Sequence, residues 1–180
     1  MSVAPWSFSR IKAFEQCPKQ FYHMKILKEY EDKETDAMRY GTLMHEAAEN
    51  YVKESTPLPS EFKYVRAGLD EENKKAWVVD YKTGKSARYA DKGQLELMAL
   101  AVFKHFPIVE QVKAGLLFVV CTELVKGQYS NKDQTMLWDK WIGKFTQMQT
   151  AFEADVWNAK PSGLCRKHCS VLECVHNGRN

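Results

Sequence analysis

An acid and a lysine stand two positions apart at the end of an apolar run, residues 78–82. Side chains two positions apart in an extended strand project from the same face, so Asp80 and Lys82 should lie side by side. A carboxylate can hold a hard divalent cation, while a neighbouring ammonium orients an attacking water or offsets charge on a phosphate. This geometry suits hydrolysis of a phosphodiester, although an acid and a lysine at this spacing are common in proteins. An exposed ion pair is the alternative interpretation.

Cysteines form a second candidate site that joins the two ends of the sequence. Four thiolates can hold a tetrahedral zinc ion or an iron-sulfur cluster, and their spacing does not decide between the two. His168 and His176 offer further ligands. Cys121 falls in an apolar segment, where we expect a buried core residue. The four candidate ligands are Cys17, Cys165, Cys169 and Cys174.

Basic residues crowd around the first motif, where they could meet phosphates. A solvated basic loop is the alternative interpretation. The net charge of +3 and the pI near 8.5 permit a DNA partner without requiring one. The crowded residues are Lys82, Lys85, Arg88 and Lys92.

The bulk composition is that of one globular domain. The chain has 180 residues, of which 44% are hydrophobic and 27% charged. It contains neither a signal peptide pattern nor an apolar run long enough to span a bilayer, so we expect a cytoplasmic protein without a membrane role. An odd number of cysteines in such a protein favours metal or redox chemistry over disulfides.

The periodicity predicts helices at both ends and in the middle of the chain. Ser7 or Ser9 should cap a first helix, which Pro18 breaks. A second helix should follow Gly41, run to about Lys53 and carry His45 in its first turns. Thr56 to Ser60 reads as a linker.

The later part of the chain predicts a small mixed sheet flanked by helices, an α/β fold. Glu61–Leu69 and Ala76–Tyr81 should form a hairpin around a turn at Glu71–Lys75. The remaining elements should be a helix at Gln94–Phe106, a buried strand at Val112–Cys121 and a helix at Lys132–Trp157.

Several separated motifs in this order resemble the RecB-like branch of the PD-(D/E)XK nucleases. The resemblance spans nearly the whole chain and implies a restriction-endonuclease-like fold. The matching motifs are Ser7-Phe8-Ser9 through Cys17-Pro18 with Tyr22, Gly41-Thr42-Leu43-Met44-His45-Glu46, Asp80-Tyr81-Lys82-Thr83-Gly84-Lys85, and Gln94-Leu95-Glu96-Leu97 with Ala99-Leu100-Ala101.

The resemblance implies a role for each matching residue. His45 and Asp80 would bind Mg²⁺ or Mn²⁺ together with the Tyr81 carbonyl. Lys82 would be the catalytic lysine, and Gln94 would position the lysine or the substrate. The resemblance also implies a 4Fe-4S cluster, held by one early and three late cysteines, with zinc as the alternative. This cluster would be structural and would join the chain's two ends.

Asp70 and Met98 depart from the family pattern. The family carries a further metal-binding aspartate on the preceding strand, and Asp70 is the nearby candidate. In a regular hairpin Asp70 would pair near Ala76, roughly 13 Å along the ladder from Asp80. Either the hairpin is irregular, for instance through a bulge, or Asp70 is a turn residue. Met98 stands where the family usually has tyrosine.

We therefore expect a metal-dependent deoxyribonuclease, an exonuclease on single-stranded DNA ends, with Lys85 and Arg88 binding DNA. A catalytically impaired DNA-binding or assembly protein is the alternative, and a zinc-stabilised interaction module is a more distant one. The expected domain covers 1–180, with 1–31 and 158–180 forming the cluster part and 41–130 the nuclease core. Protein partners in recombination or CRISPR adaptation are implied by resemblance alone.

Overall fold

The computed structural model describes residues 4–30, 39 and 68–179. The chain divides into two compact units, 1–33 with 139–180, and 34–138, which are described separately. The helix predicted at Gly41–Lys53, its His45 and the linker Thr56–Ser60 lie outside the described residues. A search of the described helices finds none that is long and apolar enough to cross a membrane.

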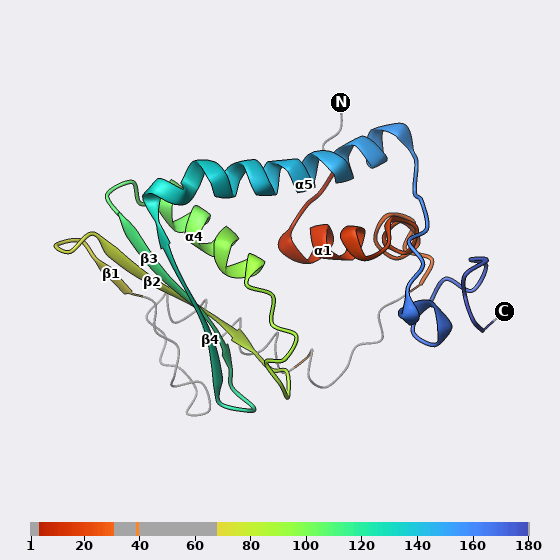
Figure 1. Cartoon of the computed structure of the whole chain (residues 1–180), viewed down its shortest axis with the longest axis horizontal. Helices are drawn as coiled ribbons and strands as arrows, with labels where there is room; N and C mark the ends of the chain where they lie inside the picture. The colour runs from red at the N-terminus through yellow and green to blue at the C-terminus, as the bar shows by residue number, and fades with distance from the viewer. Residues whose placement is uncertain (1–3, 31–38, 40–67, 180) are drawn as a thin grey trace. The chain divides into compact units, whose positions relative to one another are not determined.

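The unit formed by residues 34–138 is built on a four-stranded sheet in the order β1-β2-β3-β4 (Figure 1). The central pair β2–β3 is parallel, and both outer pairs are antiparallel. A parallel pair needs a crossover connection, and helix α4, Gly93–His105, supplies it. The strands are β1 Gly68–Asp70, β2 Lys75–Lys82, β3 Gln111–Phe118 and β4 Glu123–Ser130.

Helix α4 packs on one face of this sheet and closes its core. Leu95, Ala99 and Phe103 recur every four residues and form one helix face. That face meets alternate residues of β3, which share a side of the sheet. Met98 packs against the same core, so it fills space there as methionines do. The buried core consists of Ala76, Leu95, Ala99, Phe103, Val109, Val112, Ala114, Leu116 and Phe118.

The strand predicted at Val112–Cys121 is shorter than expected, and the strand after it was missed. β3 ends at Phe118, and Thr122 adopts a left-handed conformation with φ 56°. The chain then returns as β4, whose half-buried Val125 and Tyr129 pack against the core. The prediction for Cys121 is corrected accordingly, because this residue lies in the turn and is half-buried against the core.

The other unit begins with a broken helix, as predicted. Helix α1, Phe8–Gln16, is capped by Ser7, whose hydroxyl accepts a hydrogen bond from the Arg10 backbone N–H at 3.2 Å. The chain becomes extended at Cys17. Helix α2, Pro18–Phe21, then starts with proline in its first turn, and the π-helix η1, Tyr22–Ile26, follows.

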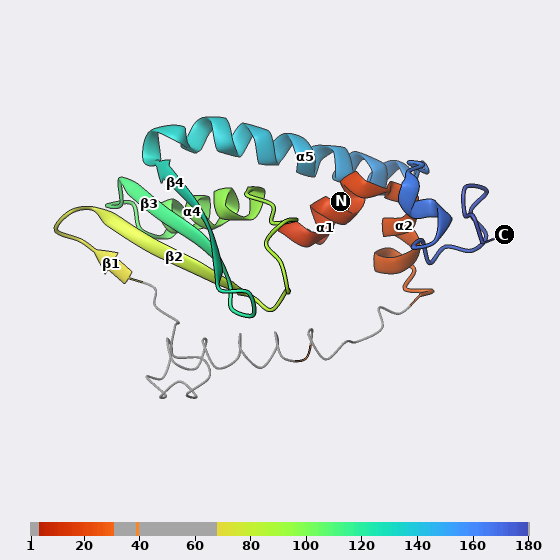
Figure 2. The same ribbon diagram turned by 60° about the horizontal axis from the view of Figure 1, so that its bottom comes forward.

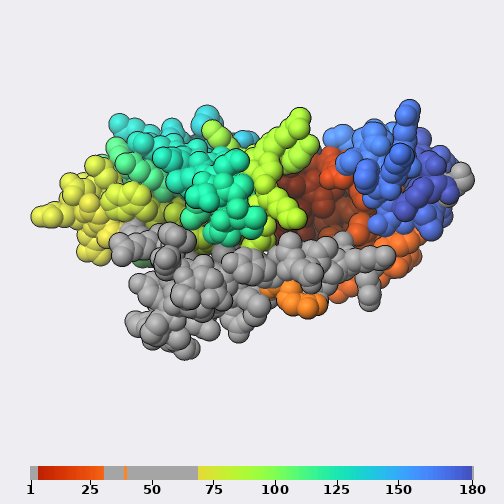
Figure 3. Space-filling model, turned by 90° about the horizontal axis from the view of Figure 1, so that it is seen from below, coloured from red at the N-terminus to blue at the C-terminus, as the bar shows by residue number. Residues whose placement is uncertain are grey.

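An aromatic cluster joins the start of the chain to its end within this unit. Trp157 follows helix α5, Gln134–Ala154, and stacks on Tyr22 with ring centroids 4.9 Å apart. The early and late segments are therefore neighbours, as the orange and blue surfaces in Figure 3 show. Three more rings contact Trp157, namely Phe14, Phe21 and Phe152. The short helices η3, Asn131–Asp133, and η4, Gly163–Arg166, flank α5 in the sequence.

An ionic network around Glu15 supports the same packing. Burial would raise the pKa of Glu15, but hydrogen bonds and positive charge from Lys144 and Lys12 outweigh burial and lower this pKa. The Lys12 ammonium lies 3.2 Å from the carboxylate, and the Lys160 ammonium donates to the Glu15 carbonyl at 2.8 Å. Helix α1, helix α5 and the segment after α5 therefore meet at one residue.

Because one leucine lies in the core and another on the opposite side of the sheet, we expect their replacement by alanine to destabilise the fold to different extents. Leu116→Ala removes a side chain that is 1% exposed and should lower the free energy of unfolding by about 2 to 5 kcal/mol. Leu124→Ala removes one that is 46% exposed and should change it by about 0.5 kcal/mol or less. Urea denaturation of both variants checks this expectation. Equal costs would contradict the assignment of the core to the α4 face.

Candidate functional site

Three polar side chains meet at the end of β2. The Lys82 ammonium lies 2.6 Å from Asp80 Oδ2, and Gln94 Nε2 donates to the same oxygen at 2.6 Å. The Asp80 side chain is 14% exposed and the Lys82 side chain 32%. A carboxylate this sheltered and this well contacted differs from an exposed surface ion pair.

The strand geometry explains why Asp80 and Lys82 share one face. Ala76 and Val78, four and two positions before Asp80, point into the α4 core, so Asp80 and Lys82 continue the same side of β2. The Lys82 carbonyl accepts from Val119 N–H at 3.0 Å, on the β3 side. The carbonyl of the preceding residue, Tyr81, is therefore directed toward the other edge of β2.

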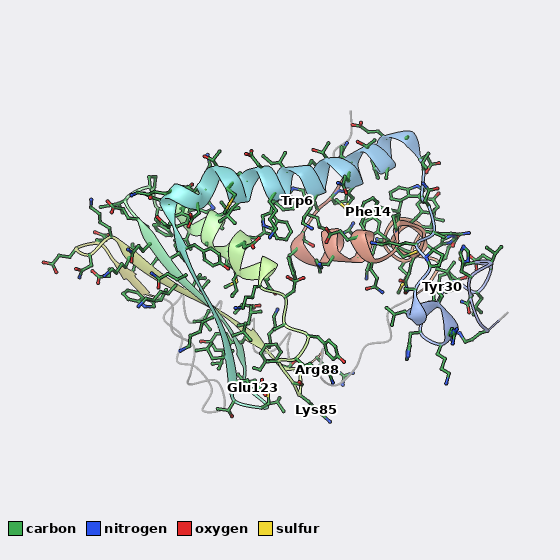
Figure 4. The ribbon with its side chains drawn as sticks, viewed as in Figure 1. Trp6, Phe14, Tyr30, Lys85, Arg88 and Glu123 are labelled. Atoms are coloured by element: carbon green, nitrogen blue, oxygen red, sulfur yellow. The ribbon has the colours of Figure 1, made fainter. Side chains whose placement is uncertain are left out.

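Gln94 reaches Asp80 from the first turn of α4. Asp91 fixes this turn, because its Oδ1 accepts from Gly93 N–H at 2.8 Å. The residues at the two ends of the loop between β2 and α4, Lys82 and Gln94, therefore both contact Asp80. Figure 4 shows Lys85 and Arg88, both exposed, on this loop.

The structure does not bring Asp70 to this site. Asp70 pairs with Lys75 at the start of β2, five residues from Asp80, which is about 16 Å at the rise of a strand. Figure 2 shows the β1–β2 turn and the β2–α4 loop at opposite ends of the sheet. Hydrogen bonds from the backbone and side chain of Asn73, both 3.0 Å, lower the Asp70 pKa. Asp70 is therefore a turn residue here, and its predicted role as a metal ligand is not supported.

The described ranges hold only part of the predicted metal ligand set. His45 lies outside them. Within them, no group of three histidine, cysteine or acidic side chains gathers around Asp80. Of the predicted ligands near Lys82, the structure describes the Asp80 carboxylate and the Tyr81 carbonyl, both hard oxygen donors of the kind that Mg²⁺ and Mn²⁺ prefer.

The four predicted cysteines converge in the unit formed by the chain's ends. They line one small cavity with Lys160, Pro161 and His176. Cys169 and Cys174 are buried, while Cys17 and Cys165 are half-buried. Sequence separation between the first cysteine and the other three is large, so only the fold brings them together. The cavity-lining cysteines are Cys17, Cys165, Cys169 and Cys174.

Two of the four cysteine sulfurs accept backbone hydrogen bonds. The Lys160 N–H donates to Cys17 Sγ and the Ser162 N–H to Cys165 Sγ, each at 3.4 Å. In metal sites, contacts of this kind from outside the ligand set orient the ligating side chains. The arrangement therefore suits a metal centre whose ligands come from both ends of the chain.

Two residues that sequence reasoning missed shape the cysteine loop. Asn177 is 5% exposed, and its amide donates to the carbonyls of Cys169 at 3.2 Å and Val171 at 2.8 Å. Gly178 lies so close to Arg166 that a Cβ would stand 2.9 Å from its Cα. An Asn-Gly pair shortly after the last cysteine signals a turn, but no spacing rule tells that its amide organises the loop.

A polar cluster also fastens the C-terminal segment to the end of η1. His23 Nδ1 lies 2.5 Å from Glu29 and 3.3 Å from Glu173. The Tyr30 hydroxyl donates to Glu173, beside Cys174. Figure 4 labels Tyr30 where the two segments meet. Tyr30 also packs against the small buried cluster that contains Cys169, Val171 and Cys174.

Comparison with known proteins identifies the family. The family model of the PD-(D/E)XK nuclease superfamily matches residues 5–70 and 65–174. The two matched segments overlap at residues 65–70, the stretch that ends with Asp70. Searches of curated proteins and of solved structures found no match. The mixed sheet with its helices confirms the predicted α/β fold class. With its signature strand end in place and nearly its whole length matched, the chain belongs to the PD-(D/E)XK nuclease superfamily.

Proposed function

We propose that this protein is a metal-dependent deoxyribonuclease that digests DNA from single-stranded ends. The observation that carries the proposal is the shared contact of Lys82 and Gln94 with Asp80 Oδ2. A carboxylate, an amine and an amide at one strand end suit hydrolysis of a phosphodiester. The preference for single-stranded ends rests on the resemblance to RecB-like nucleases.

Asp80 would hold the divalent cation with the Tyr81 carbonyl and His45. When bound, Mg²⁺ or Mn²⁺ would polarise the phosphate and make its water more acidic. Lys82, kept on the face of Asp80 by the pleat of β2, would orient the attacking water and offset charge on the phosphate. Gln94 is a positioning residue, because it acts on the substrate through the carboxylate that it holds.

Lys82→Ala should lower kcat on single-stranded DNA by about 100- to 10,000-fold with Mn²⁺ or Mg²⁺ present, because it removes the group that positions the water. Lys75→Ala is the matched control. Lys75 lies on the same strand at the opposite end, facing the other side of the sheet. Digestion of end-labelled DNA measures both. Undiminished cleavage by the Lys82 variant would end this mechanism.

Gln94→Ala should lower activity by about 10- to 100-fold, because the Asp80 carboxylate loses a donor that fixes its orientation. The apparent affinity for Mn²⁺ should fall as well, which a purely structural defect would not produce selectively. Titration of cleavage rate against Mn²⁺ separates the two effects. A variant with wild-type rate and wild-type Mn²⁺ dependence would remove Gln94 from the site.

A catalytically impaired DNA-binding protein of the same fold is the second candidate. The position of Asp70 favours it, because the acid expected on the preceding strand sits at the far end of β2. This candidate expects retention of DNA without cleavage, with equal retention by the Lys82→Ala variant. The cleavage assay described above distinguishes the two.

We also propose that the four cysteines hold a 4Fe-4S cluster that serves a structural role. A tetrahedral zinc ion with Zn–S distances of about 2.3 Å would bring its sulfurs to about 3.8 Å from one another. Among the described residues, no three cysteine sulfurs all lie within 4.8 Å of one another. The preference for a cluster over zinc rests on the resemblance to RecB-like nucleases.

Cys17→Ser should abolish iron binding and the brown colour of the purified protein, and should destabilise the unit formed by the chain's ends. Cys121→Ser is the matched control. Cys121 lies in the other unit, so this substitution should leave iron binding and colour unchanged. Iron and sulfide analysis with visible absorption spectroscopy tests this. A colourless wild-type protein with bound zinc would show that the cysteines hold zinc and would contradict the proposed cluster.

A further inference from the structure

The loop between β2 and α4 presents an aromatic ring to solvent. Tyr89 is 85% exposed. The Ala90 N–H donates to the Ala87 carbonyl at 2.9 Å, so residues 87–90 form a turn with Arg88 and Tyr89 at its tip. A single exposed aromatic residue is ordinary on a protein surface, so exposure alone assigns no role.

The turn is anchored in a way that fixes the direction of Tyr89. Ala87 and Ala90 both pack against the core under α4. Ser86 Oγ accepts from the Arg88 N–H at 3.1 Å. With its first and last residues held inward, the turn must direct its two central side chains outward. The exposed ring is therefore a consequence of a built turn, not of a loose loop.

Arg88 completes the surface around the ring. Its guanidinium lies over the Tyr89 ring at 5.6 Å from the centroid, a cation–π arrangement. An aromatic face beside a guanidinium suits an unpaired nucleobase followed by its phosphate, since bases stack on aromatic rings and Arg attracts the backbone. Lys85 adds positive charge to the same loop.

The ends of this loop tie it to the catalytic carboxylate. The loop starts after Lys82 and ends at Gln94, and both residues contact Asp80 Oδ2. A DNA strand that binds this loop would therefore bind the same segment whose end residues contact Asp80. We propose that Tyr89, with Arg88 beside it, is a stacking platform for an unpaired base of single-stranded DNA. The inference rests on the proposed function and names a residue that selects single strands.

The test compares Tyr89→Ala with Tyr89→Phe, both in a Lys82→Ala background without added divalent cation, so that no DNA is cut. Binding of fluorescent oligothymidylate should weaken by about 5- to 150-fold for Tyr89→Ala. Tyr89→Phe should stay within about twofold of the parent, because it keeps the ring face. Phe106→Ala is the control, since Phe106 is also exposed, 47%, but ends α4.

Two further readouts separate stacking from other effects. Affinity for a blunt duplex should not change with Tyr89→Ala, because paired bases already stack on one another. Arg88→Gln should reduce the salt dependence of single-strand binding by about 0.7 in the slope, whereas Tyr89→Ala should leave this slope unchanged. Equal binding by Tyr89→Ala and its parent, or equal losses for Ala and Phe, would overturn the platform. The cleavage assay on Lys82 tests the nuclease proposal independently.

Discussion

The carboxylate of Asp80 is the point at which a strand and a helix become one site. Lys82 comes to it through the pleat of β2, and Gln94 through the first turn of α4. The contact of Gln94 depends on the parallel pairing of β2 and β3, because that pairing requires the crossover that carries α4. The packing of Leu95, Ala99 and Phe103 on the sheet then fixes the position of α4, and with it the position of Gln94 relative to the carboxylate.

Local sequence signals predicted the elements whose ends are marked by a capping residue or a proline, or whose apolar residues are periodic. Ser7 capped the first helix, Pro18 followed the break at Cys17, and the amphipathic run from Gln94 became α4 within one residue at each end. β4 was missed because its inward residues, Val125 and Tyr129, are separated by two polar residues and a glycine and give no apolar run. The preceding strand looked longer than it is for the opposite reason, since apolar residues continue into its turn.

Site residues were predictable where chemistry and spacing agree. Asp80 and Lys82 share a face by strand geometry alone, whereas the contact of Gln94 depends on how α4 packs and came from resemblance. The cysteines were foreseen as a set, and the structure gathers them around one cavity. Asp70 illustrates the limit. The distance expected in a regular hairpin already separated Asp70 from Asp80, in conflict with the family pattern. The observed register was needed to show that Asp70 lies beside the turn and is hydrogen-bonded to Asn73. Tyr89 carried no signal, because no short-range rule tells which side chains a turn holds outward.

The distribution of charge constrains how this protein can hold DNA. The unit 1–33 with 139–180 has twelve Lys and Arg against eight Asp and Glu, whereas the unit 34–138 has fourteen against fifteen. The unit that carries Asp80 therefore has no net positive charge with which to attract a polyanion over its whole surface. The DNA affinity that we propose for this unit must come from local features, and the loop from Lys82 to Gln94 carries Lys85, Arg88 and Lys92. Charge alone attracts single and double strands alike, since both present phosphates. An exposed ring discriminates between them, because stacking needs a base that is not already stacked on its neighbours.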